Sequence, residues 1–194
     1  VDGSGTNHLA QPDEMASVAK SLRSQGADVL SHACDVRSAE SVKQLFNAVM
    51  GHFGRVDVLI NNAGIAGPDL LSVTEFREQR TFEQLMMKTV AELCSRLIPQ
   101  MQSRGMGWVI NVASVAGRFP SSDSGNYGPA KAYVIALSEE LNLAVKNDGI
   151  KVTTLCPGFT HTEFHAVAGL MDAKTNSPSW IWYDASTVVR EGLA

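Results

Sequence analysis

The chain has 194 residues, of which 44% are hydrophobic and 19% are charged, and its formal net charge is -4 at pH 7. This composition is typical of a globular domain that buries a hydrophobic core without disulfides or metals. The 20 acidic and 16 basic residues are spread along the sequence and form no basic stripe for phosphates, so we expect no nucleic-acid partner. No run approaches the roughly 20 consecutive apolar residues of a membrane-spanning helix, and the N-terminal residues do not resemble a signal peptide, so we expect no membrane association.

Cysteine usage argues against a cross-linked or metal-stabilised fold. The three cysteines, Cys34, Cys94 and Cys156, are odd in number and form no C-x-x-C pair. This pattern predicts neither a disulfide framework nor a zinc ribbon. Free thiols are typical of reducing compartments, so the sequence favours a cytoplasmic location.

Apolar runs of strand length alternate with longer stretches of helical periodicity. In residues 39–52, for example, apolar side chains recur at the spacing of one helix face. Such alternation is typical of βαβ units and predicts an α/β fold, a Rossmann-like doubly wound parallel sheet with helices on both faces. In chain order we expect a helix at Asp13–Gln25, a strand at Ala27–Ala33, a helix at Ala39–His52, a strand at Val56–Asn61, a helix at Thr81–Arg104, a strand at Trp108–Val112, a helix at Ala130–Asn147 and a strand at Lys151–Cys156.

The sequence predicts a single domain over residues 1–194, with ligand-binding loops at one end of its sheet. The loops Gly64–Thr74 and Gly117–Gly125 each follow the carboxyl end of an expected strand, which is where open α/β sheets bind ligands. Residues 163–186 contain Gly, Pro and Ser together with several large aromatic residues. We expect them to form a substrate-binding flap, and a surface loop held by its aromatic side chains is the alternative.

Tyr127 and Lys131 form the strongest candidate catalytic pair. They are four residues apart at the start of an expected helix, so their side chains share one face. A free tyrosine has a pKa near 10, and a neighbouring cation favours the phenolate, so we expect Lys131 to lower the pKa of Tyr127 and make it a usable acid or base. A surface tyrosine beside a lysine is the alternative for this pattern alone.

Ser114 provides the context for this pair. It lies 13 residues before Tyr127, where the stretch Asn111-Val112-Ala113-Ser114 ends an expected strand ahead of Gly117. A hydroxyl on a rigid strand end is suited to hold a carbonyl oxygen while the phenol protonates it. An ordinary turn residue is the alternative for Ser114 by itself.

With these residues the chain resembles the short-chain dehydrogenase/reductase family, and the resemblance runs from about Asp2 to the C-terminus. Ser114, Tyr127 and Lys131 match the family's catalytic serine, tyrosine and lysine in order and spacing. The resemblance implies that Tyr127 is the acid or base and that Ser114 holds the carbonyl. It also implies that Lys131 lowers the tyrosine pKa and binds the ribose hydroxyls of a nicotinamide cofactor.

The same resemblance implies a set of cofactor-binding residues. Asp35-Val36 resembles the family's adenine contact, the stretch ending Asn62-Ala63-Gly64 resembles its NNAG motif, and Pro157-Gly158 with two threonines resembles the segment beside the nicotinamide. Glycines there let the backbone approach a ligand closely. The implied cofactor-binding residues are Asp2, Asp35, Val36, Asn62, Ala63, Gly64, Tyr127, Lys131, Pro157, Gly158, Thr160 and Thr162.

Cofactor choice depends on Asp2. The resemblance aligns Asp2 with the end of the family's second strand, where an acid accepts from the adenosine ribose hydroxyls and repels a 2′-phosphate. We therefore expect NAD, with NADP as the alternative cofactor. A frayed terminal residue is the alternative for Asp2 itself.

Two departures from the family pattern are visible. The family's first strand and its T-G-x-x-x-G-x-G loop would precede Asp2 and its last strand would follow this chain, so the sequence resembles a member truncated at both ends. Second, Met86 aligns with the family's catalytic asparagine, and a thioether cannot hold the water that links the lysine to solvent. A core residue on an amphipathic helix is the plain interpretation of Met86.

A metal site is not expected. His161 and His165 are four residues apart, but Glu163 is not directly after the first histidine as the zinc motif H-E-x-x-H requires.

We therefore expect an NAD(P)-dependent oxidoreductase that interconverts a secondary alcohol and a ketone by hydride transfer, as a carbonyl reductase or alcohol dehydrogenase does. The alternative is a catalytically inactive protein that senses dinucleotide or acts as an interaction scaffold. The expected partner is a small-molecule alcohol or carbonyl substrate. The resemblance further implies a homodimer or homotetramer, assembled through the helices Thr81–Arg104 and Ala130–Asn147.

Overall fold

The computed structural model describes residues 12–72, 76–120, 125–162 and 178–193. The chain divides into two units, one ending at Val56 and the other beginning at Asp57. Each unit is described by itself, and the single domain over residues 1–194 stays a prediction. No helix among the described residues is both long and apolar enough to cross a membrane.

Residues 12–56, the described part of the N-terminal unit, contain two helices, α1 (Pro12–Ser24) and α2 (Ala39–Phe53). Ser38 caps α2, since its hydroxyl accepts a hydrogen bond from the Ser41 N–H at 3.3 Å. Gly54 ends the helix in the left-handed conformation, at φ 75°, which a residue with a Cβ adopts at a cost. Both predicted helices are confirmed to within one residue at each end.

The predicted strand Ala27–Ala33 is wrong. These residues join α1 to α2 without entering a strand, and Val29 and Leu30 are only half-buried. A strand requires a hydrogen-bonded neighbour as well as apolar side chains, and no described strand pairs with this segment. Instead Asp28 contacts the His52 imidazole of α2 at 2.9 Å, which ties the segment to that helix.

The C-terminal unit is built on a parallel sheet of three strands in the order β1 (Val58–Asn61), β2 (Gly107–Val112), β3 (Ile150–Leu155). Leu59, Val109 and Val152 lie side by side in its register. The three predicted strands of this region are confirmed, each shifted by two residues or fewer at its ends. The α/β class is confirmed as well.

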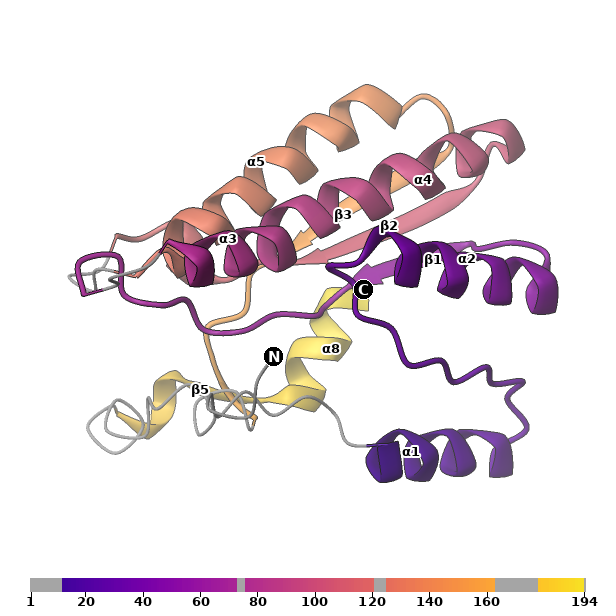
Figure 1. Ribbon diagram of the computed structural model, residues 1–194, viewed down its shortest axis with the longest axis horizontal. Helices are drawn as coiled ribbons and strands as arrows, with labels where there is room; N and C mark the ends of the chain where they lie inside the picture. Colours follow the sequence, from indigo (N-terminus) through magenta and orange to yellow (C-terminus); the bar gives the residue numbers. More distant parts are fainter. Residues whose placement is uncertain (1–11, 73–75, 121–124, 163–177, 194) are drawn as a thin grey trace. The chain divides into compact units, whose positions relative to one another are not determined.

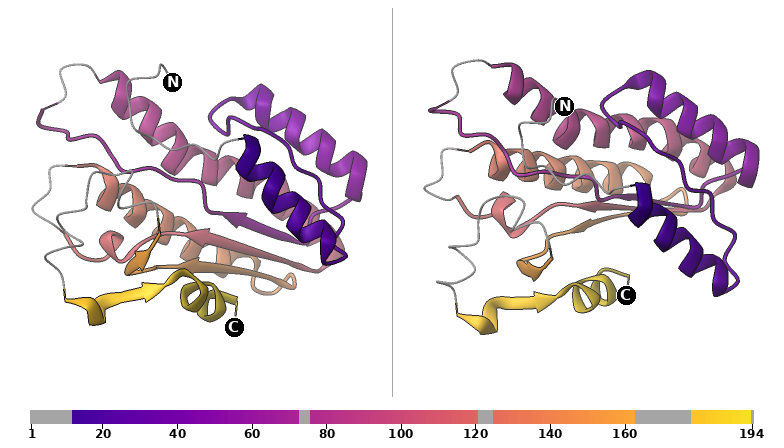
Figure 2. Two further views of the ribbon diagram at one scale, coloured as in Figure 1. Left: turned by 90° about the horizontal axis from the view of Figure 1, so that it is seen from below. Right: turned by 60° about the horizontal axis from the view of Figure 1, so that its bottom comes forward.

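Helices lie on both faces of this sheet (Figure 1). One face is covered by α4 (Thr89–Arg104) and α5 (Tyr127–Val145), and the β2 residues on that face, such as Val109, are buried. On the other face, α8 (Ala185–Leu193) lies close to β3, where a Cβ at Gly192 would come within 2.9 Å of Leu155. Figure 2 shows α8 on the opposite side of the strands from α5.

The predicted helix Thr81–Arg104 begins earlier than expected and is interrupted. It runs from α3 (Arg77–Glu83) through a π-helical turn at Gln84–Lys88 into α4. The extra residue of a π-turn leaves no mark on hydrophobic periodicity, so the sequence did not indicate it. Such turns occur often at functional sites.

A small second sheet follows β3. In it β4 (Phe159–His161) pairs in parallel with β5 (Trp182–Asp184), and the Trp182 ring lies 5.1 Å from the Phe159 ring and 5.3 Å from the His161 ring. Strands of three residues are too short to show an alternating pattern, so neither was predicted. Of the predicted flap, residues 163–177 lie outside the described residues, and its remainder forms a short 3-10 turn at Ser179–Ile181, the strand β5 and the start of α8.

Buried amides connect the strands to the helices above them. Asn61 at the end of β1 donates to the Asn111 side chain of β2 at 2.8 Å. Asn111 donates in turn to the Ser138 hydroxyl of α5 at 2.9 Å, and Ser138 donates to the Val134 carbonyl at 2.6 Å. Asn111 and Ser138 are fully buried, so each group depends on its partner for hydrogen bonding.

This network predicts a specific loss of stability. In Ser138→Ala the Asn111 amide loses its close acceptor and keeps only the long contact with the Cys94 sulfur at 3.9 Å, and a buried unsatisfied N–H costs about 1 to 3 kcal/mol. We expect urea denaturation to show a fall of that size in the free energy of unfolding. Ser103→Ala is the matched control, because the exposed Ser103 donates to the Gln100 carbonyl of its own helix. Equal effects of the two substitutions would contradict a role for the network.

Candidate active site

Ser114 is held on a rigid strand end. The chain leaves β2 alongside the end of β3, with the Ala113 N–H donating to the Leu155 carbonyl at 2.7 Å and the Val115 N–H to the Pro157 carbonyl at 3.0 Å. Between these bonds Ser114 is extended and caps a short 3-10 turn, since its hydroxyl oxygen accepts from the Ala116 N–H at 3.2 Å. The side chain therefore has a defined position at the carboxyl end of the sheet.

Tyr127 is the first residue of α5 and is hydrogen-bonded to Ser114. Burial raises the pKa of the phenol above its usual 10, and the hydrogen bond to Ser114 opposes that shift only in part. The net direction is opposite to the one expected from the sequence, because the loss of solvent outweighs the hydrogen bond to Ser114. At neutral pH Tyr127 is therefore a protonated phenol that can donate a proton.

Lys131 lies one helical turn further along α5 and is buried, with 6% of its surface exposed. Its ammonium donates to the Val112 carbonyl at 2.8 Å and lies 5.6 Å from the centre of the Tyr127 ring. Burial lowers the pKa of Lys131 to about 8, and the nearby Cys156 thiol acts weakly in the other direction. The predicted sharing of one helix face by Tyr127 and Lys131 is confirmed.

The loop after β1 passes next to Lys131. Asn62, Ala63 and Gly64 are exposed, and a Cβ placed on Gly64 would lie 3.4 Å from the Met86 sulfur and 3.8 Å from the Lys131 ammonium. The backbone at Gly64 therefore passes directly beside Lys131. This arrangement brings the ends of β1, β2 and β3 together around α5, as the sequence predicted.

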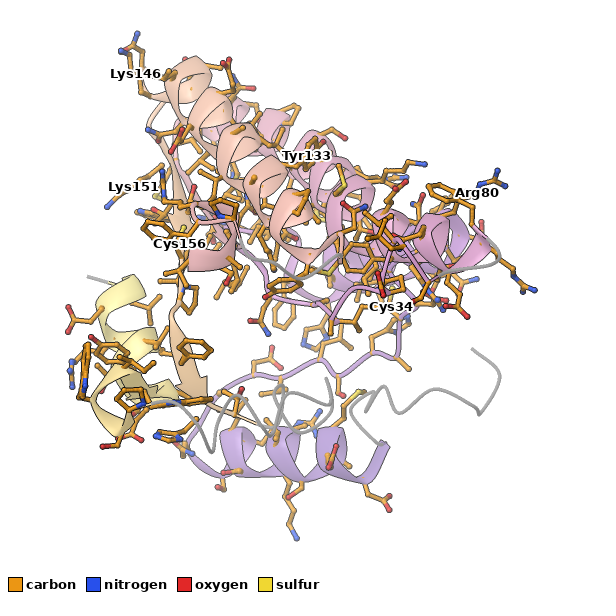
Figure 3. The ribbon with its side chains drawn as sticks, turned by 90° about the vertical axis from the view of Figure 1, so that its left-hand side faces the viewer. Cys34, Arg80, Tyr133, Lys146, Lys151 and Cys156 are labelled. Carbon is orange, nitrogen blue, oxygen red and sulfur yellow. The ribbon has the colours of Figure 1, made fainter. Side chains whose placement is uncertain are left out.

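The segment after β3 borders the site from the other side. Figure 3 labels Cys156, which precedes Pro157, and the Pro157 carbonyl is the one that accepts from Val115. Thr160 is buried in β4, where its hydroxyl donates to the Gly158 carbonyl at 3.1 Å. Thr162 is exposed. Their predicted contacts with a cofactor stay predictions.

The remaining predicted cofactor residues belong to the N-terminal unit. Asp35 forms a bidentate ion pair with Arg37, with both side-chain contacts at 2.8 Å, and these hydrogen bonds lower the pKa of its carboxyl below the usual 3.8. Val36, next to it, is half-buried. Asp2 lies outside the described residues. The assignment of all three to the cofactor stays a prediction.

Two features of the site escaped sequence reasoning. The acceptor for Lys131 is a main-chain carbonyl, which no residue type reveals. The sulfur of Met86 accepts a hydrogen bond from the Ile65 N–H at 3.4 Å, although its position on a helix suggested only a core residue.

The described residues contain no group of three His, Cys, Asp or Glu side chains that could hold a metal ion. Glu163 and His165 lie outside the described residues.

The lowered pKa of Lys131 predicts how stability depends on pH. Between about 8 and the usual 10.5, the unfolded chain keeps a proton on Lys131 that the folded chain has lost. Because the unfolded state then binds more protons, folding stability rises with pH in this window, and below it the full cost of burying the charge is present. Relative to Lys131→Met, the free energy of unfolding of the wild type should rise by about 1 to 2 kcal/mol from pH 8 to pH 9.5. A constant difference between the two proteins would contradict a buried, titrating Lys131.

Comparison with known proteins agrees with this geometry. A family model described as short chain dehydrogenase matches residues 5–172. The chain is 29% identical over 153 residues to the 3-oxoacyl-[acyl-carrier-protein] reductase FabG of Staphylococcus epidermidis, and this match covers 79% of the chain and 63% of the relative. It is 32% identical over 131 residues to the FabG of Vibrio cholerae, which covers 68% of the chain and 54% of the relative. The chain thus spans less than two thirds of the length of these relatives.

Solved structures have the same fold. A short-chain dehydrogenase from Sphingobium yanoikuyae in complex with NADPH superposes with a TM-score of 0.83 and 25% identity, over 95% of this chain and 71% of that one. An NAD⁺-bound xylitol dehydrogenase superposes with a TM-score of 0.71 and 26% identity, over 82% and 65% of the two chains. Between them, these neighbours carry both nicotinamide dinucleotides.

Proposed function

Because the chain belongs to the short-chain dehydrogenase family, we propose that it acts as an NAD(P)-dependent oxidoreductase that interconverts a secondary alcohol and a ketone. The observation that carries the proposal is the Ser114–Tyr127 hydrogen bond, with the Lys131 ammonium 5.6 Å from the phenol ring. A proton donor, a group to hold the carbonyl and a cation are then present at one strand end. The relatives named FabG make a 3-oxoacyl thioester the first ketone to test.

The residues around Lys131 fit a nicotinamide dinucleotide. The exposed backbone of Asn62, Ala63 and Gly64 offers donors and acceptors, and the missing Cβ of Gly64 leaves room for a ligand beside the Lys131 ammonium. Lys131, Gly64 and Pro157 would hold the dinucleotide at this end of the sheet. When bound, the nicotinamide supplies or accepts the hydride.

The protein's own contribution is a proton and its placement. In the direction of reduction, the Tyr127 O–H donates its proton to the carbonyl oxygen while Ser114 holds that oxygen in place. Burial keeps the phenol protonated at neutral pH, which favours its role as an acid. The Lys131 charge stabilises the phenolate that remains after transfer.

Removing the Tyr127 hydroxyl tests this mechanism. Tyr127→Phe deletes the proton donor and leaves the ring, so turnover of a ketone substrate should fall at least about a hundredfold with dinucleotide binding preserved. The measurement is the absorbance of the reduced nicotinamide during turnover, with binding measured separately by calorimetry. Tyr133→Phe, on the same helix, is the matched control and should keep its activity. A Tyr127→Phe protein with more than half of wild-type activity would rule the mechanism out.

Cofactor preference depends on Asp2 in this proposal. A carboxylate at the ribose accepts hydrogen bonds from its hydroxyls, whereas a 2′-phosphate would place two like charges at about 4 Å, at a cost of about 1 to 4 kcal/mol. We expect kcat/KM to favour NAD(H) over NADP(H) by at least about tenfold, and Asp2→Ala to narrow that ratio. A preference for NADP(H) would mean that Asp2 does not face the ribose.

The alternative function is a dinucleotide sensor or interaction scaffold without catalysis. Met86, in place of the family's asparagine, favours it, because a thioether cannot bind the water of a proton relay. Dinucleotide binding with no turnover of any ketone, in a protein whose Tyr127→Phe variant behaves identically, would establish this alternative.

We also propose that the protein forms a homodimer or homotetramer through α4 and α5, as the resemblance to the family implies. A cytoplasmic location is consistent with Cys34, Cys94 and Cys156, all of which are free thiols.

A further inference from the structure

The Met86 side chain connects the π-helical turn to the loop after β1. Met86 is 2% exposed, and its sulfur accepts a hydrogen bond from the Ile65 N–H at 3.4 Å. The same sulfur and its methyl group lie 3.4 Å from where a Cβ would sit on Gly64. One thioether therefore contacts both residues of the Gly64–Ile65 peptide.

The π-helical turn and the packing around Met86 support this contact. The turn widens at Gln84, whose carbonyl accepts from both the N–H and the hydroxyl of Thr89, the latter at 2.8 Å. Thr89 is itself buried, so the hydrogen bonds that complete the widened turn come from a residue of the same helix and not from solvent. Met86 packs with Phe82 and Ala130, and Ala130 directly precedes Lys131. The thioether thus lies between the loop and the helix that carries the catalytic pair.

We propose that Met86 is a positioning residue whose sulfur holds the Ile65 N–H and so fixes the Gly64–Ile65 peptide beside Lys131. The structural part of this inference stands on the contacts alone. Its consequence for dinucleotide binding rests on the proposed function, which assigns Gly64 and Lys131 to the cofactor.

The chemistry of the side chain explains why methionine can occupy this position. The sulfur of Met86 is separated from Cβ by the same number of bonds as the amide oxygen of an asparagine, so either atom can accept from the Ile65 N–H. A thioether, however, has no hydrogen to donate. Methionine therefore keeps the bond to the loop and loses the donor capacity that an amide would offer to water or ligand.

Three substitutions separate the acceptor from the bulk of the side chain. Met86→Leu keeps the apolar volume and removes the acceptor, and Leu–Met exchanges are well tolerated in cores. Met86→Asn restores an acceptor at the same bond count. Met101→Leu is the matched control, because Met101 is fully buried in α4 but packs against Gly107 rather than Gly64.

Two measurements are made on the full chain of each variant. Amide hydrogen exchange, followed by NMR, reports the protection of the Ile65 N–H directly. Calorimetric titration with NADH and with NADPH reports the Kd of each dinucleotide. Circular dichroism confirms that each variant is folded.

We expect Met86→Leu to speed exchange at Ile65 about tenfold and to raise the dinucleotide Kd about fivefold or more. Met86→Asn should return both values to within about threefold of wild type, and Met101→Leu should change neither.

Unchanged Ile65 exchange in a folded Met86→Leu protein would overturn the anchor. Faster exchange with an unchanged Kd would overturn the positioning role, and so would a folded Met86→Asn protein that restores neither value. A wild-type chain that binds neither dinucleotide would instead count against the proposed function, and the exchange data would still decide the anchor.

Discussion

The burial of one ammonium group governs the chemistry at the end of this sheet. Lys131 keeps 6% of its surface exposed and satisfies its charge with the Val112 carbonyl. Placing a cation there carries a solvation cost, visible in a pKa lowered to about 8. The same lack of solvent raises the pKa of Tyr127. One physical cause thus moves the two pKa values apart, so that the phenol holds its proton more tightly and the ammonium releases its proton more easily.

This arrangement depends on the strands and the helix that carry the reactive groups. The Asn61, Asn111 and Ser138 side chains join β1, β2 and α5 through buried hydrogen bonds, and these elements lead into the Gly64 loop, Ser114 and the helix of Tyr127. A polar network of this kind holds only when every group finds its partner, which makes it specific for one register. The strands and the helix are therefore fixed relative to one another directly beneath the reactive groups.

The loop after β1 is held from a different direction. The Ile65 N–H donates a hydrogen bond to the Met86 sulfur, and Met86 lies in the π-helical turn. The shape of this turn therefore affects the position of the backbone beside Lys131. Through this hydrogen bond Met86 supports the site without touching the substrate. Met86 is thus a core residue that also defines the position of a loop.

The sequence by itself determined the α/β class, the three paired strands, the helices α1, α2, α4 and α5, and the meeting of Ser114, Tyr127 and Lys131. These features follow from local rules: apolar periodicity sets element type, and parallel strands bring their carboxyl ends to one edge. Tertiary structure decided the rest. Ala27–Ala33 reads as a strand but forms none, because pairing depends on a neighbour that is remote in sequence. The predicted direction of the Tyr127 pKa shift was wrong, because burial is a property of the packed molecule and its effect exceeds that of the Ser114 hydrogen bond. The π-turn at Met86 and the short strands β4 and β5 likewise arise from contacts between distant segments, which no local pattern of residue types encodes.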